Sequence, residues 1–221
     1  MGLREKQTAE RKRRILDVAD SLIRQTGGTE FSMRMLAEKA EVSPATPYNL
    51  FGSKEGILSA SLARTLTRTM FEGLAPQSEE PLDFVITASG TAVDLLVDNR
   101  KLLRPLYLYL LGVVDPTHRP AHIRRSVRYW RTVADTALSA ANPSNSVDDI
   151  DRESVGYTLF AHFLGLLELW VHEDIDDDVF RGRAIYGGLQ LILPFAEPEA
   201  AGHIQDRIAA AKSTLTDLSA R

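Results

Sequence analysis

Apolar residues recur along almost the whole chain with a period near 3.6 residues, and no segment alternates apolar and polar residues over the length of a strand. The first clear stripe begins at Ile15 and ends before Gly27–Gly28, a common helix stop. Its members fall at i, i+3, i+4, i+7 and i+8, namely Ile15, Val18, Ala19, Leu22 and Ile23. This periodicity predicts an all-α protein.

Two short helices are predicted after the first one. Ser32 has the position of an N-cap and precedes a short apolar stripe. The next helix comes from SPATPYNLFGSKE, residues 43–55, with Ser43 as its N-cap and Pro44 as its first residue. Pro47 then falls at the fourth position and removes only the opening hydrogen bond of the helix.

A fourth helix and a domain boundary follow. Gly52 is predicted to end the third helix in a left-handed conformation, and Ser53 to cap the fourth. The proline-containing acidic segment APQSEEP, residues 75–81, reads as a linker. We therefore predict an amino-terminal domain over residues 1–74 and a larger helical domain over residues 81–221. The helices expected in the second domain are Leu82–Val97, Arg100–Leu111 with a kink at Pro105, Pro120–Ala141, Ile150–His172, Asp177–Phe195 and Glu199–Leu218.

Charge is distributed unevenly between the two predicted domains. Residues 1–74 hold 12 Lys and Arg against 9 Asp and Glu, whereas the remainder holds 14 against 21. The basic excess permits an anionic partner at the amino-terminal end. The chain has no cysteine, which excludes disulfides, thiolate metal sites and a cysteine nucleophile.

No targeting segment is recognised in the sequence. The amino terminus, MGLREKQTAERKRR, has charges but no apolar run after them, so it does not resemble a secretory signal. The longest apolar run, Leu159–Val171, is interrupted by His162, Gly165 and Glu168 and is shorter than a bilayer span. We expect no membrane partner and a cytoplasmic location.

Two short helices joined by a tight turn form a helix-turn-helix, whose second helix can enter the major groove of DNA. Residues 11–58, above all FSMRMLAEKAEVSPATPYNLFGSKEGIL, resemble the DNA-binding domain of the TetR family of transcriptional regulators. The resemblance implies a three-helix DNA-binding domain followed by a helical domain for ligand binding and dimerisation. It also implies a regulator, most often a repressor, that binds a palindromic DNA operator as a homodimer and is released by a small-molecule effector.

The resemblance also implies roles for individual residues. Thr46, Tyr48 and Lys54 match positions that contact phosphates, and Arg34 matches a position that reaches a base edge in some members. Asn49 could read adenine or bond a phosphate. The full DNA-binding set predicted in this way is Ser32, Arg34, Ser43, Pro44, Ala45, Thr46, Tyr48, Asn49 and Lys54.

This sequence departs from the family pattern in the recognition helix. Pro47 stands where leucine is common, and Pro44 and Ala45 occupy positions that can carry polar base readers. Thymine methyl contacts and DNA shape are then expected to supply more of the specificity. Two alternatives stay open: Tyr48 and Phe51 could be core aromatics, and the basic run of residues 11–14 could be a solvated face or a phosphate contact.

The predicted effector pocket lies in the second domain and is mostly apolar, which favours a lipophilic or aromatic effector. The candidates are Leu103, Tyr107, Leu110, Trp130, Phe160, His162, Phe163 and Leu167. Ordinary core packing is the alternative for each. The segment YTLFAHFLGLLELWV is apolar nearly all round, so a second copy of the chain is expected to cover part of it, with Gly187–Gly188 as a point of close approach.

No enzyme motif is present, and we predict no catalytic residue, no cofactor and no metal site. His118 and His122 have a spacing that could ligate a metal, but Pro120 between them favours a polar loop that enters a helix. The acidic residues between 174 and 178 are interpreted as a helix start. A second hypothesis keeps the helix-turn-helix but has no effector, which would make the protein an effector-independent dimeric DNA-binding or architectural protein.

Overall fold

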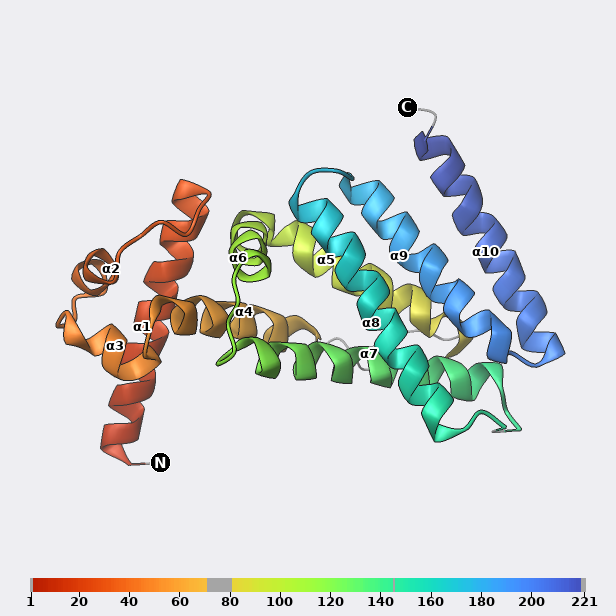
Figure 1. Ribbon diagram of the computed structural model, residues 1–221, viewed down its shortest axis with the longest axis horizontal. Helices are drawn as coiled ribbons and strands as arrows, with labels where there is room; N and C mark the ends of the chain where they lie inside the picture. Colours follow the sequence, from red (N-terminus) through yellow and green to blue (C-terminus); the bar gives the residue numbers. More distant parts are fainter. Residues whose placement is uncertain (1, 71–80, 145, 220–221) are drawn as a thin grey trace. The chain divides into compact units, whose positions relative to one another are not determined.

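The computed structural model describes residues 2–70, 81–144 and 146–219, and its regular elements there are all helical (Figure 1). The chain packs as two compact units. Unit 1 combines Met1–Thr67 with Asn99–His122, and unit 2 combines Arg68–Asp98 with Ile123–Arg221. The all-α fold predicted from periodicity is confirmed.

Unit 1 contains the helix-turn-helix and one later helix. Its elements are α1 (Leu3–Thr26), α2 (Met33–Lys39), α3 (Ala45–Phe51), α4 (Lys54–Met70) and α6 (Arg100–Gly112). The part of α4 up to Thr67 belongs to unit 1. The apolar stripe of α1 forms the core with α2 and α4, and Ile15, Ile23, Leu36 and Ile57 are fully enclosed. α1 also packs against α2 and α6.

Most local signals at the helix ends of unit 1 behave as predicted. Gly27 ends α1 in the left-handed region, with φ 71° and ψ 9°. Gly52 follows α3 with a positive φ of 78°, but its ψ of −52° lies outside the predicted left-handed region. The backbone N–H of Met35 donates to Ser32 Oγ at 3.1 Å, and that of Gly56 donates to Ser53 Oγ at 3.2 Å. Of the three predicted serine caps, Ser32 and Ser53 are confirmed.

The start of α3 differs from the prediction by one residue. Pro44, not Ser43, is the N-cap, and α3 begins at Ala45. Pro47 is thus the third helical residue, whose N–H would have no partner within the helix in any case. Pro47 therefore removes no helical hydrogen bond, and its buried ring contributes to the core of unit 1.

Unit 2 is a helical bundle around α9. It contains η1 (Pro81–Asp83), α5 (Phe84–Asp98), α7 (Arg119–Ala141), α8 (Asp149–Val171), α9 (Asp177–Ile192), η2 (Leu193–Phe195) and α10 (Pro198–Ser219). The part of α7 from Ile123 onward belongs to unit 2. α9 packs against α5, α8 and α10, which lie around it in Figure 1. The predicted acidic helix start is Asp176, whose carboxylate accepts from the N–H of Val179 at 2.8 Å.

A row of aromatic rings joins three helices of unit 2. Trp130 of α7 lies 4.9 Å from Phe163 of α8, and Phe163 lies 5.3 Å from Phe180 of α9. Phe180 lies 5.7 Å from Trp170, at the end of α8. These buried rings form a large part of the core.

The two units do not follow the predicted domain limits throughout. Residues 99–122 pack with the amino-terminal helices, although the prediction assigned them to the second domain. The sequence pattern places α6 correctly along the chain but carries no information on its packing partner. Residues 75–80 of the predicted linker lie outside the described residues.

α8 agrees with the predicted helix Ile150–His172 to within one residue at each end. It spans 23 residues and has the length and apolar composition of a membrane span, with half of the apolar window buried in the protein. Within unit 2, α8 packs against α9, and its buried side chains belong to the core of that unit. Gly187 on α9 is a close-approach point within the chain, because a Cβ there would lie 2.2 Å from Nε2 of His162 on α8.

Candidate nucleic-acid interface

α3 presents a short exposed face. Pro44, Ala45, Tyr48 and Asn49 are exposed, and Tyr48 keeps 54% of its surface accessible. Pro47 is buried on the opposite side. A large aromatic side chain in this position contributes little to the core, so the alternative of Tyr48 as a core residue is disfavoured.

Two hydroxyl side chains meet at the start of α3. Ser43 Oγ and Thr46 Oγ1 are 2.8 Å apart, and the N–H of Thr46 donates to the carbonyl of Ser43 at 2.9 Å. The pair fixes the turn between α2 and α3. Each hydroxyl keeps hydrogen-bonding capacity for a further partner such as a phosphate oxygen.

α2 adds one base-reading candidate beside this face. Arg34 is exposed at the second position of α2, next to the cap that Ser32 forms. Met35, with 44% of its surface exposed, follows it. A guanidinium on a capped, ordered helix start is suited to bidentate contact with guanine or with a phosphate.

Lys54 is held between two aromatic rings at the start of α4. Its Nζ lies 5.1 Å from the ring centroid of Phe31 and 5.9 Å from that of Tyr109. Both distances fall in the range of cation–π attraction. The ammonium is therefore restrained near one position while remaining partly exposed.

Tyr109 of α6 also belongs to this site, where its partner is Glu55, 54 residues earlier in the sequence. Its hydroxyl donates to Glu55 Oε1 at 2.8 Å. Hydrogen bonds from the Glu55 backbone N–H, from Ser53 and from Tyr109 hold the pKa of Glu55 below its ordinary value. Partial burial and the bond to Glu55 raise the pKa of Tyr109. Glu55 thus stays ionised and anchors Tyr109 beside Lys54.

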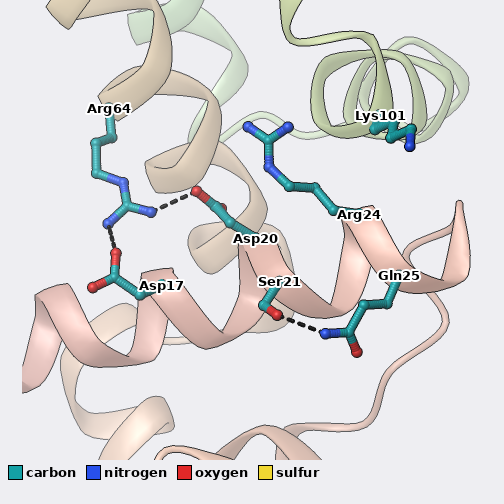
Figure 2. A pocket seen from close by; sticks show the side chains of 7 residues that line it. All are labelled: Asp17, Asp20, Ser21, Arg24, Gln25, Arg64 and Lys101. Carbon is teal, nitrogen blue, oxygen red and sulfur yellow. Dashed lines mark hydrogen bonds and ion pairs between the residues drawn. The ribbon is translucent and has the colours of Figure 1, made fainter.

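A hollow of about 460 Å³, lined by polar and charged residues, lies elsewhere in unit 1 (Figure 2). Arg64 of α4 donates to Asp17 at 2.6 Å and to Asp20, both on α1, and Ser61 also donates to Asp20. Burial lowers the pKa of Arg64, but Asp20 and Asp17 outweigh that effect and raise it. The cluster fastens α4 to α1 and so fixes the direction of α4. The remaining lining side chains are Ser21, Arg24, Gln25 and Lys101.

The eight predicted effector-binding residues do not gather in one unit. Leu103, Tyr107 and Leu110 belong to unit 1, and none of them lines the hollow of Figure 2. The other five belong to unit 2, namely Trp130, Phe160, His162, Phe163 and Leu167. His162 Nε2 lies 3.1 Å from the carbonyl oxygen of Arg183, which holds its ring against α9. The effector set stays a prediction.

His118 and His122, whose spacing could ligate a metal, have other partners. Asp115 accepts from the backbone N–H of His118 at 2.9 Å, and His118 Nδ1 lies 3.0 Å from the same carboxylate. The His122 ring packs against Tyr107 with centroids 5.9 Å apart. Over the described ranges, no cluster of three or more metal-ligating side chains occurs.

Sequence reasoning missed two features of this interface. The sequence predicts that Pro47 removes the opening hydrogen bond of α3, whereas Pro47 removes none and is a buried core residue. Tyr109 belongs to no motif, and no signal in one sequence connects it to Lys54; only the packing of α6 in unit 1 does so.

Comparisons with known proteins agree with this geometry. Residues 15–60 match the profile of a family described as bacterial regulatory proteins, tetR family. The chain is 38% identical over 74 residues to the HTH-type transcriptional repressor KstR of Rhodococcus jostii (strain RHA1). That match covers 34% of this chain and spans only 35% of the length of the repressor.

Two solved structures share the fold over most of their length. A TetR transcriptional regulator from Rhodococcus sp. RHA1 superposes with a TM-score of 0.67 at 17% identity, covering 85% of this chain and 97% of that one. A tetR-family regulator from Streptomyces coelicolor superposes with a TM-score of 0.64 at 18% identity, covering 100% of both. The helix-turn-helix geometry and the profile match agree that residues 15–60 resemble the DNA-binding domain of the tetR family, and the two superpositions show that the whole chain shares the fold of these two regulators.

Proposed function

We propose that the protein is a transcriptional repressor that binds a palindromic DNA operator as a homodimer and is released by a small lipophilic or aromatic effector. The observation that carries this proposal is the exposed face of α3. Tyr48 and Asn49 project from it, Arg34 stands on the neighbouring helix, and Lys54 is restrained at the start of α4. These side chains are donors suited to phosphates and base edges.

The proposed readout combines few base contacts with several phosphate contacts. Thr46, Tyr48 and Lys54 bind phosphates and set the register of α3 in the major groove. Arg34 and Asn49 are the side chains that can discriminate bases by paired hydrogen bonds. Pro44 and Ala45 offer only apolar surface, so the deformability of the operator supplies part of the specificity.

A stripe on α8 supports the homodimer. Tyr157, Ala161, Gly165 and Leu169 recur every four residues and are all exposed. Tyr157 keeps 56% of its surface accessible and Leu169 keeps 40%. An ordered stripe of this kind, with small residues at its centre, suits close packing against its own copy. Two copies also provide the two recognition helices that a palindrome requires.

The effector and the cytoplasmic location belong to the same proposal. Unit 2 encloses the aromatic rings of Trp130, Phe160 and Phe163, which would favour an apolar ligand if they separate to admit one. Release of DNA then requires that the effector bind the released state more tightly than the DNA-bound state.

The test is selection of bound sequences from a random duplex library with the purified full-length protein, repeated with Tyr48→Ala. We expect enrichment of a palindrome by the parent protein and its loss in the variant. The enriched site then serves to screen lipophilic and aromatic compounds for release of DNA at fixed salt. Absence of enrichment at low salt, with a folded protein, would contradict the proposal.

A further inference from the structure

The amino-terminal half of α1 is a helical arm that has no core to cover. Residues 4–14 are all exposed, and burial begins only at Ile15. At about 1.5 Å per residue the arm is roughly 16 Å long. In Figure 1 it extends past α3 toward the end labelled N.

The arm is strongly basic. Residues 4–14 contain six Lys and Arg and two acidic residues. Positive charge at the start of a helix is disfavoured by the helix dipole, and Glu5 is the one acidic residue in the first turn. A bound polyanion would remove this conflict.

Five of the six basic residues of the arm lie on two opposite faces, and the sixth, Arg14, faces the carbonyl oxygen of Glu41. Arg4, Thr8, Arg11 and Lys12 precede Ile15 by 11, 7, 4 and 3 residues, so they continue the helix face that packs in the core further along. On the arm this face has polar and cationic side chains in place of apolar ones. Lys6 and Arg13 lie on the opposite face, and Arg13 pairs with Glu10 at 2.6 Å.

One contact places the first face beside the recognition helix. Lys12 Nζ lies 5.9 Å from the ring centroid of Phe51, the last residue of α3. Lys12, on the cationic face of the arm, therefore lies beside the carboxyl end of α3.

We propose that this arm is a second DNA-binding element, in which Arg4, Arg11 and Lys12 bind backbone phosphates that flank the site read by α3. The inference rests on the proposed function, because DNA that meets α3 brings its adjacent phosphates toward Lys12. Charge complementarity and the position of Lys12 beside α3 both identify double-stranded DNA as the partner. The contacts are independent of sequence and extend the footprint outward from each half-site.

The experiment compares two double variants of the full-length protein. Arg11→Ala/Lys12→Ala removes two charges from the proposed face, and Lys6→Ala/Arg13→Ala removes two from the opposite face of the same helix. Binding to a fluorescent 40-bp duplex of arbitrary sequence is measured by anisotropy as a function of salt. Each lost phosphate contact makes the slope of log affinity against log salt less steep by about 0.9.

We expect the first variant to lose about 1 to 2 units of slope per protomer and about tenfold in affinity at 0.1 M salt. The second should change affinity by less than about twofold, because only the general field of the protein is altered. The charge-retaining variant Arg11→Lys/Lys12→Arg should restore the parent slope. Hydroxyl-radical footprints on the selected palindrome should shorten at both outer ends for the first variant only.

Equal losses in the two alanine variants, or no loss in either, would overturn the arm proposal while leaving DNA binding by α3 intact. A parent protein that binds no duplex at low salt would instead contradict the proposed function itself. Thermal unfolding of each variant shows whether the fold is preserved, since the altered side chains are exposed.

Discussion

The exposed face of α3 and the core of unit 2 both use aromatic side chains, for different purposes. Tyr48 keeps 54% of its surface accessible on a helix of only seven residues, whereas Trp170 and Phe180 are almost fully enclosed. The enclosed rings touch one another across α8 and α9. Burial of such rings stabilises a fold by several kcal/mol each, whereas an exposed ring adds little.

This difference separates the residues that hold the protein together from those available to a partner. In unit 1 the core is mainly aliphatic, with Phe31 and Tyr107 also buried, and caps and ion pairs fix polar groups around it. In unit 2 most large apolar side chains pack in the core, although some, such as Tyr157 and Leu169, stay exposed. Substitutions in the two regions should therefore affect stability and DNA affinity in opposite proportions.

The largest expected effect is that of Phe180→Ala in unit 2. Phe180 is fully buried and contacts both Phe163 and Trp170, so the variant loses transfer free energy and leaves a cavity. We expect the free energy of unfolding to fall by about 3–5 kcal/mol. Chemical denaturation monitored by tryptophan fluorescence measures it. Tyr48→Ala is the contrasting variant and should change stability by less than about 0.5 kcal/mol; similar losses in both would refute the separation.

The second effect tests whether α3 and α4 are held rigidly. A Cβ at Gly56 would lie 2.1 Å from the backbone carbonyl oxygen of Phe51 and 3.3 Å from Nε2 of His118. Gly56→Ala must therefore move the backbone, and we expect a loss of about 1–3 kcal/mol in unfolding free energy. Unlike Phe180→Ala, it should also weaken DNA binding in conditions where the protein remains folded, because α3 shifts. Anisotropy well below the melting temperature measures the binding, and unchanged affinity would show that the α3–α4 junction is adaptable.

The sequence predicted those features that depend on local chemistry. The cap at Ser32 and the positive φ angles of Gly27 and Gly52 are predicted correctly because caps and positive φ angles depend on the residue itself. The effect of Pro47 is predicted wrongly because it depends on where the helix starts. With a start one residue later, Pro47 falls among the first residues of the helix, whose N–H groups make no hydrogen bond within it. The packing of α6 in unit 1, and hence Tyr109 beside Lys54, depends on tertiary contacts that helix periodicity does not encode.

Tyr109→Phe tests this tertiary link to the interface. The variant keeps the ring near Lys54 but loses the 2.8 Å hydrogen bond from the Tyr109 hydroxyl to Glu55. The acceptor of that bond is an ionised carboxylate, because the pKa of Glu55 is lowered. We expect a loss of about 1 kcal/mol in DNA affinity, roughly fivefold, because Lys54 is less well positioned. Anisotropy on the selected palindrome measures it. Lys54→Ala should remove the effect of Tyr109→Phe, and additive losses in the double variant would mean that Tyr109 acts elsewhere.

The smallest expected effect concerns two glycine variants that distinguish the stability of the subunit from the affinity of the dimer. Nothing lies within 4 Å of a Cβ built at Gly165 of α8 or at Gly202 of α10. Replacing either glycine by alanine should therefore stabilise the isolated subunit by about 0.5–1 kcal/mol through helix propensity alone. Gly165 lies in the exposed stripe proposed as the dimer contact, whereas Gly202 does not. Sedimentation at decreasing concentration should then show a weaker dimer for Gly165→Ala and an unchanged one for Gly202→Ala. Equal dissociation constants would mean that the subunits do not meet closely at Gly165, and the proposed contact would have to move to another face of the protein.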